Sequence, residues 1–204
     1  MYIRASHRPK EDAHVVEIVR RHMFATMITA SADGMIASHL PFVFEPEKGE
    51  HGTLFAHMAR ANAQGAVIGS EAEALVIFSG PHAYISPSWY ADRATAPTWD
   101  YIAVHCYGPT RRHSEVEARE NIARLIDAVE APMTKKWSMN ELAEQEVRAM
   151  LGNIVSFEIP VGRIEAKFKL NQGEKPNRTR AAIEELERNG AEELARYMRA
   201  YNGL

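Results

Sequence analysis

Residues 24–46 read FATMITASADGMIASHLPFVFEP, and this stretch decides the fold class. Two β-compatible runs flank Ala32-Asp33-Gly34, and Asp-Gly between such runs is a strong hairpin signal. We therefore predict strands near residues 24–30 and 35–44. Because a tight hairpin joins antiparallel strands, we expect an antiparallel sheet.

Further elements are predicted on both sides of this hairpin. An apolar stripe after an acidic first turn predicts a helix over Glu11–Met23. Strands are expected near residues 52–59, 73–80, 99–107 and 153–170, the third following a Pro-rich aromatic loop and the last bent around Pro160 and Gly162. A short helix is expected to end near Gly69. Four further helices are expected over residues 114–129, 140–150, 179–188 and 191–201.

This order of elements favours an α+β fold over a doubly wound parallel sheet, because the helices do not alternate regularly with the strands. A small antiparallel barrel is the natural way for about six strands to remove their exposed edges. We expect peripheral helices around the barrel and a helical insert at residues 114–150.

Composition narrows the class of protein. The 204 residues carry 24 Lys and Arg against 27 Asp and Glu, a formal net charge of −3, which argues against a uniformly basic nucleic-acid binder. Cys106 is the single cysteine, so a disulfide within the chain and a cysteine-based zinc cluster are excluded, and a reducing cytoplasm is the expected location. No apolar run approaches the roughly 20 residues that span a bilayer, so no membrane association is expected.

Common catalytic signatures are absent from the sequence, which lacks G-x-G-x-x-G, Walker A, H-E-x-x-H and G-x-S-x-G. The nine histidines lack the spacing of a tetrahedral zinc site, so we predict no metal. The sequence identifies no catalytic acid or base.

Two stretches are candidates for ligand contact. His57, Arg60 and Asn62 fall where a strand ends and a helix begins, which suits an anion cradle, although a solvated loop arginine explains the same pattern. The aromatic segment 82–101 suits one wall of a site for a flat ring, and equally a dimer interface or core.

A third stretch, residues 163–180, has six basic and two acidic side chains. This local excess is compatible with a phosphate clamp, a DNA-contacting tail or a solvated face.

Longer strings of sequence resemble a known family. They are FSGPHAYISPSWY (78–90), PTWDYIAVHCYG (97–108) and IVSFEIPVGRIEAKFKLNQ (154–172), with MYIRASH, FATMIT, ASHLPF and AHMARAN earlier in the same order. The chain resembles the PaiB-like FMN-binding proteins, also described as negative transcriptional regulators, over residues 1 to about 180. The resemblance implies a split-barrel flavoprotein related to pyridoxamine-phosphate oxidases, which is a homodimer with FMN between its subunits.

The resemblance also implies cofactor-binding residues. Ser38, His39 and Leu40 would line the flavin ring and ribityl chain, and His57, Arg60 and Asn62 would hold the FMN phosphate. Trp99, Tyr101 and Lys169 are further candidates. The sequence departs from the family pattern at ANAQG (61–65), where Asn-Pro-Gln-Trp is usual and Gly65 replaces an aromatic residue, and at KLNQGEKPNR (169–178), where Lys-Leu-Ser-Gln-Asn is usual.

The expected organisation is a barrel domain over residues 1–170, including the insert at 114–150, and a helical extension over 171–204 packed on the barrel. The expected function is that of an FMN-binding homodimer labelled as a negative transcriptional regulator. Alternatives are an FMN-dependent oxidoreductase acting on a small molecule and a haem-binding split-barrel protein. The negative charge and the lack of a helix-turn-helix pattern argue against direct DNA binding.

Overall fold

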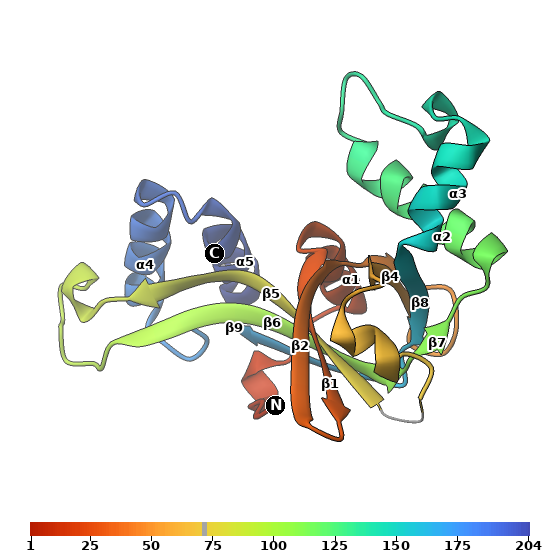
Figure 1. Ribbon diagram of the computed structural model, residues 1–204. Coiled ribbons are helices and arrows are strands. Elements are labelled where there is room, and N and C mark those ends of the chain that lie inside the picture. The colour runs from red at the N-terminus through yellow and green to blue at the C-terminus, as the bar shows by residue number, and fades with distance from the viewer. Residues whose placement is uncertain (71–72) are drawn as a thin grey trace. The chain divides into compact units, whose positions relative to one another are not determined.

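The computed structural model describes residues 1–70 and 73–204 and has an α+β fold (Figure 1). The helices are α1 (Asp12–Arg21), α2 (Glu115–Glu130), α3 (Glu144–Gly152), α4 (Pro176–Arg188) and α5 (Glu192–Asn202), with 3₁₀ turns η1 (Ala5–His7), η2 (Ala63–Val67), η3 (Pro87–Trp89) and η4 (Met139–Glu141). The strands are β1 (Phe24–Ser31), β2 (Gly34–Pro41), β3 (Val43–Glu45), β4 (Thr53–Ala59), β5 (Glu73–Ile85), β6 (Thr98–Pro109), β7 (Arg111–Arg112), β8 (Ile154–Pro160) and β9 (Arg163–Lys169). In the described part of the chain, none of the helices is long and apolar enough to cross a membrane.

The strands form two sheets, with orders β2-β1-β5-β6-β9 and β3-β4-β8-β7. The Asp-Gly hairpin forms as predicted, because β1 pairs antiparallel with β2 from Phe24 opposite Pro41 to Ser31 opposite Gly34. Gly34 has φ of +118°, the left-handed region that glycine enters without strain. In the second sheet β4 pairs antiparallel with β8, which places His57 opposite Ser156.

The chain divides into two compact units. The first consists of Met1–Ile18, Ser79–Val104 and Glu165–Leu204, and the second of Val19–Phe78 and His105–Ile164. The expected division into a barrel domain over residues 1–170 and a helical extension over 171–204 stays a prediction.

The second unit carries the insert. Its core contains fully buried side chains from both sheets, including Met27, Phe78 and Phe157, and Phe42 from between β2 and β3. Helix α2 begins at a capping box in which Ser114 and Glu117 satisfy each other's backbone N–H groups. Asn121 of α2 anchors the insert, because its Nδ2 donates to the Ala56 carbonyl and to Ser156 Oγ, both at 2.8 Å. Figure 1 shows α2 and α3 together at one end of β8.

The first unit is built around aromatic side chains. The His14 ring lies near the rings of Phe168, Tyr197 and Tyr201, and its Nδ1 is 3.0 Å from the Tyr201 hydroxyl. Helices α4 and α5 lie side by side on one side of the long strands (Figure 1). The structure confirms the helices expected at residues 179–188 and 191–201, and their apolar faces are buried.

The sequence and the structure differ at three places in the sheets. The predicted strand near residues 35–44 is two strands, β2 and β3, which belong to different sheets and are separated at Phe42. The predicted bent strand over 153–170 is two strands, since β8 and β9 belong to different sheets and the chain changes sheet at Pro160–Gly162. Gly108 of β6 makes this crossing possible, because a Cβ there would lie 2.2 Å from the Pro160 carbonyl oxygen. The short strand β7 was not predicted from the sequence.

Cys106 lies in the middle of β6 with its side chain fully buried. Burial raises the pKa of its thiol to about 12.

Candidate functional site

Two of the predicted cofactor residues meet where β2 lies beside η2. Asn62 caps η2, because its Oδ1 accepts from the Gln64 backbone N–H at 2.9 Å, and its Nδ2 donates to Ser38 Oγ at 2.9 Å. Gln64 is fully buried and donates through Nε2 to Thr29 Oγ1 at 3.0 Å. The turn after β4 is therefore fixed to the β1–β2 hairpin by side-chain hydrogen bonds.

The three predicted residues of β2 do not share a surface. Side chains alternate between the two faces of a strand. Ser38 and Leu40 therefore lie on one face of β2, and His39 lies on the other. Leu40 is buried, whereas His39 is exposed, stacks on the Phe24 ring at 6.3 Å and lies 3.0 Å from Thr26 Oγ1. A single planar ligand lying flat on β2 cannot contact both faces.

Arg60 lies at a polar cavity of about 390 Å³ in the second unit, which we call the arginine cavity. Arg112 and Arg148 also line it, with Glu115 as an acidic member, and Ser114 brings the N-terminus of α2 to its wall. Three guanidinium groups near a helix N-terminus form a surface suited to a phosphate or carboxylate.

The guanidinium of Arg60 also holds the backbone where α3 passes into β8. Its Nε donates to the Gly152 carbonyl at 2.6 Å and a terminal nitrogen donates to the Ile154 carbonyl at 2.9 Å. Arg112 donates to the Gly65 carbonyl at 2.6 Å. Arg148 is more exposed, and its ion pairs with Glu115 and Glu144 are long, at 4.0 and 3.9 Å. Arg148 is thus the arginine whose charge is least committed to these protein partners.

The structure separates His57 from the arginine cavity. His57 lines a second cavity of about 290 Å³, which we call the insert cavity. Apolar side chains from α2, residues 137–142, α3 and β8 form the rest of its lining. Burial lowers the pKa of His57, and its Nδ1 is buried without a hydrogen-bond partner among the described residues. A neutral imidazole in apolar surroundings does not suit a phosphate.

The remaining predicted residues lie in the first unit. Trp99 is 56% exposed and lies against His82 and Tyr84, with ring centroids 6.3 and 6.1 Å away. Lys167 lies over the Tyr101 ring, 5.1 Å from its centroid. These side chains present an aromatic surface on β5 and β6 of that unit.

Lys169 is engaged within the protein. Its Nζ donates to Thr98 Oγ1 and to the Trp99 carbonyl, and it lies 3.5 Å from Asp100 Oδ1. Burial raises the pKa of Asp100 to about 6, even though the charge of Lys169 acts in the opposite direction.

A buried carboxylate network in the second unit was missed from the sequence. Glu158 accepts from Arg111 and Lys48, both at 2.8 Å, and lies 3.7 Å from His113. Burial acts to raise the pKa of Glu158, but the hydrogen bonds from Arg111 and Lys48 outweigh it and hold this pKa below its usual value. Its partners come from distant parts of the chain, so no local motif marks them.

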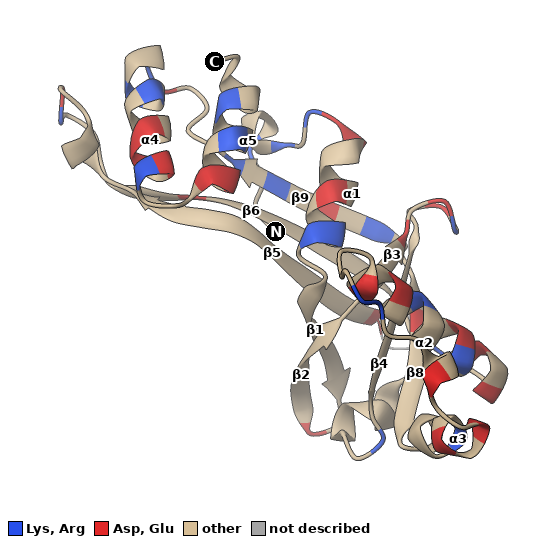
Figure 2. Cartoon of the chain, turned by 90° about the horizontal axis from the view of Figure 1, so that it is seen from above, with Lys and Arg blue, Asp and Glu red and all other residues tan. Residues whose placement is uncertain are grey.

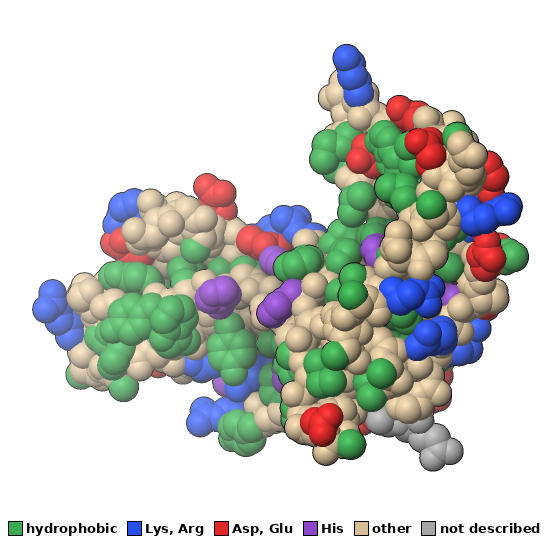
Figure 3. Space-filling model, viewed as in Figure 1, with side chains coloured by type: hydrophobic (Ala, Val, Ile, Leu, Met, Phe, Trp, Pro, Cys, Tyr) green, Lys and Arg blue, Asp and Glu red, His purple; other side chains and the backbone are tan. Residues whose placement is uncertain are grey.

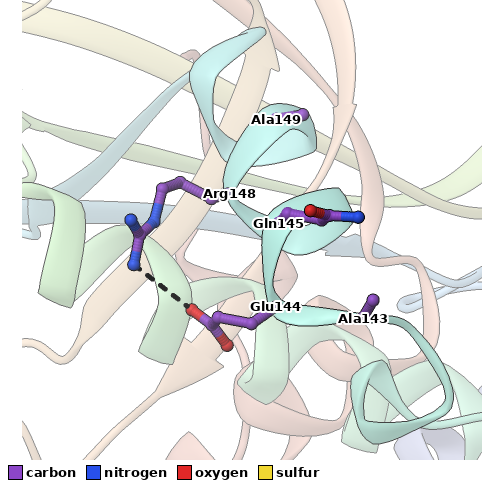
Figure 4. Close-up of a pocket in the computed structure, with 5 residues that line it drawn as sticks. All are labelled: Ala143, Glu144, Gln145, Arg148 and Ala149. Carbon is purple, nitrogen blue, oxygen red and sulfur yellow. Dashed lines mark ion pairs between the residues drawn. The ribbon is translucent and has the colours of Figure 1, made fainter.

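The charged depression beside α3 is a different kind of feature. Figure 4 shows its lining residues on one stretch of chain, with Arg148 reaching toward Glu144. An exposed ion pair four residues apart along a helix is typical of a solvated surface. Within residues 1–70 and 73–204, no group of three or more His, Cys, Asp or Glu side chains is placed to hold a metal ion.

Comparison with known proteins identifies the family. Residues 1–163 match the profile of the family described as "Putative FMN-binding domain". The chain belongs to this FMN-binding family. It is also 32% identical over 201 residues to "Protease synthase and sporulation protein PAI 2" of Bacillus subtilis (strain 168), covering 97% of this chain and 96% of that protein. The resemblance to PaiB-like FMN-binding proteins is therefore confirmed, and FMN is the cofactor of the family.

Solved structures confirm the fold class of this FMN-binding protein. The FAD and haem binding protein of Mycobacterium smegmatis matches with a TM-score of 0.58 and 12% identity, covering 79% of this chain and 72% of that one. The flavocytochrome Anf3 of Azotobacter vinelandii matches with a TM-score of 0.59 and 11% identity, covering 78% and 68%. At such low identity these likenesses show the fold alone, which is the predicted α+β split-barrel type.

Proposed function

We propose that the protein is an FMN-binding homodimer of the regulator type, in which the arginine cavity holds the FMN phosphate. The observation that carries this proposal is the convergence of Arg60, Arg112 and Arg148 on one cavity. Arg60 and Arg112 come from the ends of strands, whereas Arg148 comes from the insert. All three lie within the residues that the family profile matches.

The chemistry of the cavity supports a phosphate monoester. Guanidinium groups donate paired hydrogen bonds to phosphate oxygens, and the N-terminus of α2 adds a favourable dipole. With Glu115 as an acidic group in the lining, the formal charge of the cavity stays positive, which favours a dianionic ligand. Bound FMN supplies electron-transfer chemistry, and the residues of this chain bind and orient it.

Ser38 and Asn62 support a neighbouring role for the β2–η2 junction. Their side chains are joined by a hydrogen bond and retain further donor and acceptor capacity for the hydroxyls of a ribityl chain. Leu40, Tyr101 and Lys169 stay proposals as flavin contacts. The proposal leaves out His39, which lies on the opposite face of β2, and His57, which lines the insert cavity.

The homodimer is proposed from the exposed aromatic surface of the first unit. Tyr84 and Trp99 are 45% and 56% exposed, which is unusual for large aromatic side chains on neighbouring strands. A second copy of the chain would cover such a surface. Light scattering with and without FMN tests this, and a strict monomer in both conditions contradicts it.

The phosphate site is tested by comparing FMN with riboflavin, which lacks the phosphate. We expect Arg60→Ala and Arg148→Ala to weaken FMN binding by about tenfold to a hundredfold, because each removes a charge-assisted contact. Riboflavin binding should stay nearly unchanged. Fluorescence titration of the flavin measures both constants, and the absorption spectrum of the purified protein distinguishes flavin from haem.

Arg119→Ala is the matched control. Arg119 lies on α2, pairs with Glu144 at 3.1 Å and is not part of the cavity lining. Because Arg60 also holds two backbone carbonyls, Arg148→Ala is the variant that leaves the local backbone contacts intact. Equal losses for FMN and riboflavin, or an equal effect of Arg119→Ala, would contradict the proposed phosphate site.

A further inference from the structure

The insert cavity has an apolar lining, whereas the lining of the arginine cavity is charged. Its lining joins His57 of β4 to apolar side chains of α2, residues 137–142, α3 and β8, all within the second unit. Leu151 and Ile154 line both cavities, so the two are neighbours across these residues. In Figure 3 hydrophobic side chains gather on the face of the insert that is in view.

The lining defines the polarity of a ligand. Apart from His57, the described residues that line the cavity are apolar, so a charged ligand would lose its hydration without gaining a partner. Trp137 and Met150 are 39% and 59% exposed, and the aromatic ring and the thioether both favour contact with an aromatic ring.

His57 is the polar member of the lining. Its Nδ1 has no hydrogen-bond partner in the described part of the chain, although buried polar atoms are nearly always paired. Because this atom has no exposed surface, a ligand group meets it when the imidazole ring turns toward the cavity. The volume of about 290 Å³ lies at the lower end of the usual range for small-molecule sites.

We infer that the insert cavity is a binding site for a small, uncharged aromatic molecule that hydrogen-bonds to the imidazole of His57. The apolar walls take the ring of the ligand, and a hydroxyl or amine on that ring meets the histidine. This site is distinct from the phosphate site, so it stands or falls independently of the FMN proposal.

The test uses N-phenyl-1-naphthylamine, an uncharged aromatic amine whose fluorescence rises in apolar surroundings. We expect saturable binding to the full-length protein, both without FMN and with FMN at saturation. Met150→Glu should weaken this binding at least about tenfold, because it places a charge at the lining. No fluorescence change, as a cavity covered by a second copy of the chain would give, overturns the inference.

Met133→Glu is the matched control, since Met133 is a 52% exposed methionine between α2 and η4 that does not line the cavity. Both exposed positions tolerate a charge, and circular dichroism checks that each variant folds. An equal loss in the two variants overturns the inference. Competition between FMN and the amine also overturns it, because the cavity would then belong to the flavin.

A second measurement does not depend on introducing a charge. Energy transfer from tryptophan to the bound amine should fall strongly in Trp137→Phe, since Trp137 lines the cavity. His57→Phe should weaken binding of the amine more than binding of naphthalene, which has no hydrogen-bonding group. Unchanged energy transfer in Trp137→Phe, or an equal loss for the amine and naphthalene in His57→Phe, overturns the inference.

Discussion

Asp100 shows how burial sets the behaviour of one residue. It lies on the inward face of β6 with no exposed surface, 3.5 Å from Lys169 Nζ. Its pKa is raised to about 6, so the folded state binds a proton more tightly than the unfolded state does. This contribution to stability is fully present below the usual carboxyl pKa and is lost as the pH rises through about 6.

We therefore expect Asp100→Asn to change the pH dependence of unfolding. The difference in unfolding free energy between the variant and the parent protein should rise in favour of the variant by about 2 kcal/mol from about pH 4.5 to about pH 7.5. The reason is that the variant lacks the carboxyl that becomes a buried charge over this range. Denaturant titrations at the two pH values measure this. Asp127→Asn, at an exposed position of α2, should track the parent at both. A constant difference for Asp100→Asn would show that the carboxyl is not the group that titrates.

At the scale of elements, the crossing of β6 past the end of β8 depends on Gly108. We expect Gly108→Ala to destabilise the protein by about 2 kcal/mol or more, because the new Cβ meets the Pro160 carbonyl oxygen. The comparison is Gly152→Ala in α3, where nothing lies within 4 Å of an added Cβ. That change should stabilise by roughly 0.5 to 1 kcal/mol through helix propensity. Thermal unfolding distinguishes the two, and similar effects would rule out the close approach.

Helix α4 fixes the loop between β5 and β6 through Arg178. This buried guanidinium lies 2.9 Å from Asp92 Oδ2, 3.0 Å from Glu174 Oε2 and 3.3 Å from the Ala94 carbonyl. The loop that carries the family-like aromatic residues is thereby tied to the C-terminal helices.

Removal of this contact should expose the loop. We expect Arg178→Ala to increase tryptic cleavage after Arg93 severalfold, because local opening controls proteolysis of a folded chain. Mass spectrometry of a digestion series measures the rate at that bond. Arg180→Ala, at an exposed position of the same helix, serves as the control. Unchanged cleavage in Arg178→Ala would mean that the loop is held by other contacts.

At the scale of the whole molecule, most of the basic side chains at residues 163–180 are engaged within the protein. Arg163 stacks on the Tyr107 ring at 3.6 Å, Lys167 is 9% exposed, and Lys169 bonds to its neighbours. Figure 2 shows basic and acidic residues interspersed along α4 and α5. Side chains committed in this way have little capacity to neutralise DNA phosphates.

We accordingly expect no strong sequence-specific DNA binding by the isolated protein. At about 0.15 M salt, affinity for its own upstream region should match that for a scrambled duplex, within the nonspecific range of roughly 10⁻⁴ to 10⁻⁶ M. Fluorescence anisotropy provides the measurement. A nanomolar constant for the native duplex alone would mean that the protein reads DNA directly.

Much of the fold was predictable because its signals are local. The Asp-Gly turn, the Ser114 capping box and the apolar stripes of the helices each act within a few residues. The division of residues 153–170 between two sheets was not predictable, since it depends on the long-range approach of Gly108 to Pro160.

The candidate site was predictable only in part for the same reason. Arg60 was found because it follows a strand, whereas Arg112 and Arg148 join it through contacts that no spacing in the sequence records. The opposite orientation of Ser38 and His39 follows from the alternation of a strand. The apolar surroundings of His57 depend on the insert, whose packing the sequence pattern does not specify.

The burial of Cys106 has a practical consequence for kinetics. Because the chain has a single cysteine, any thiol-specific reagent reports on one position in β6. A thiol of such high pKa reacts only when the strand around it opens. The ratio of alkylation rates in native and denatured protein therefore gives the equilibrium constant for opening of the five-stranded sheet around β6. Each tenfold slowing of alkylation corresponds to about 1.4 kcal/mol in the free energy of opening.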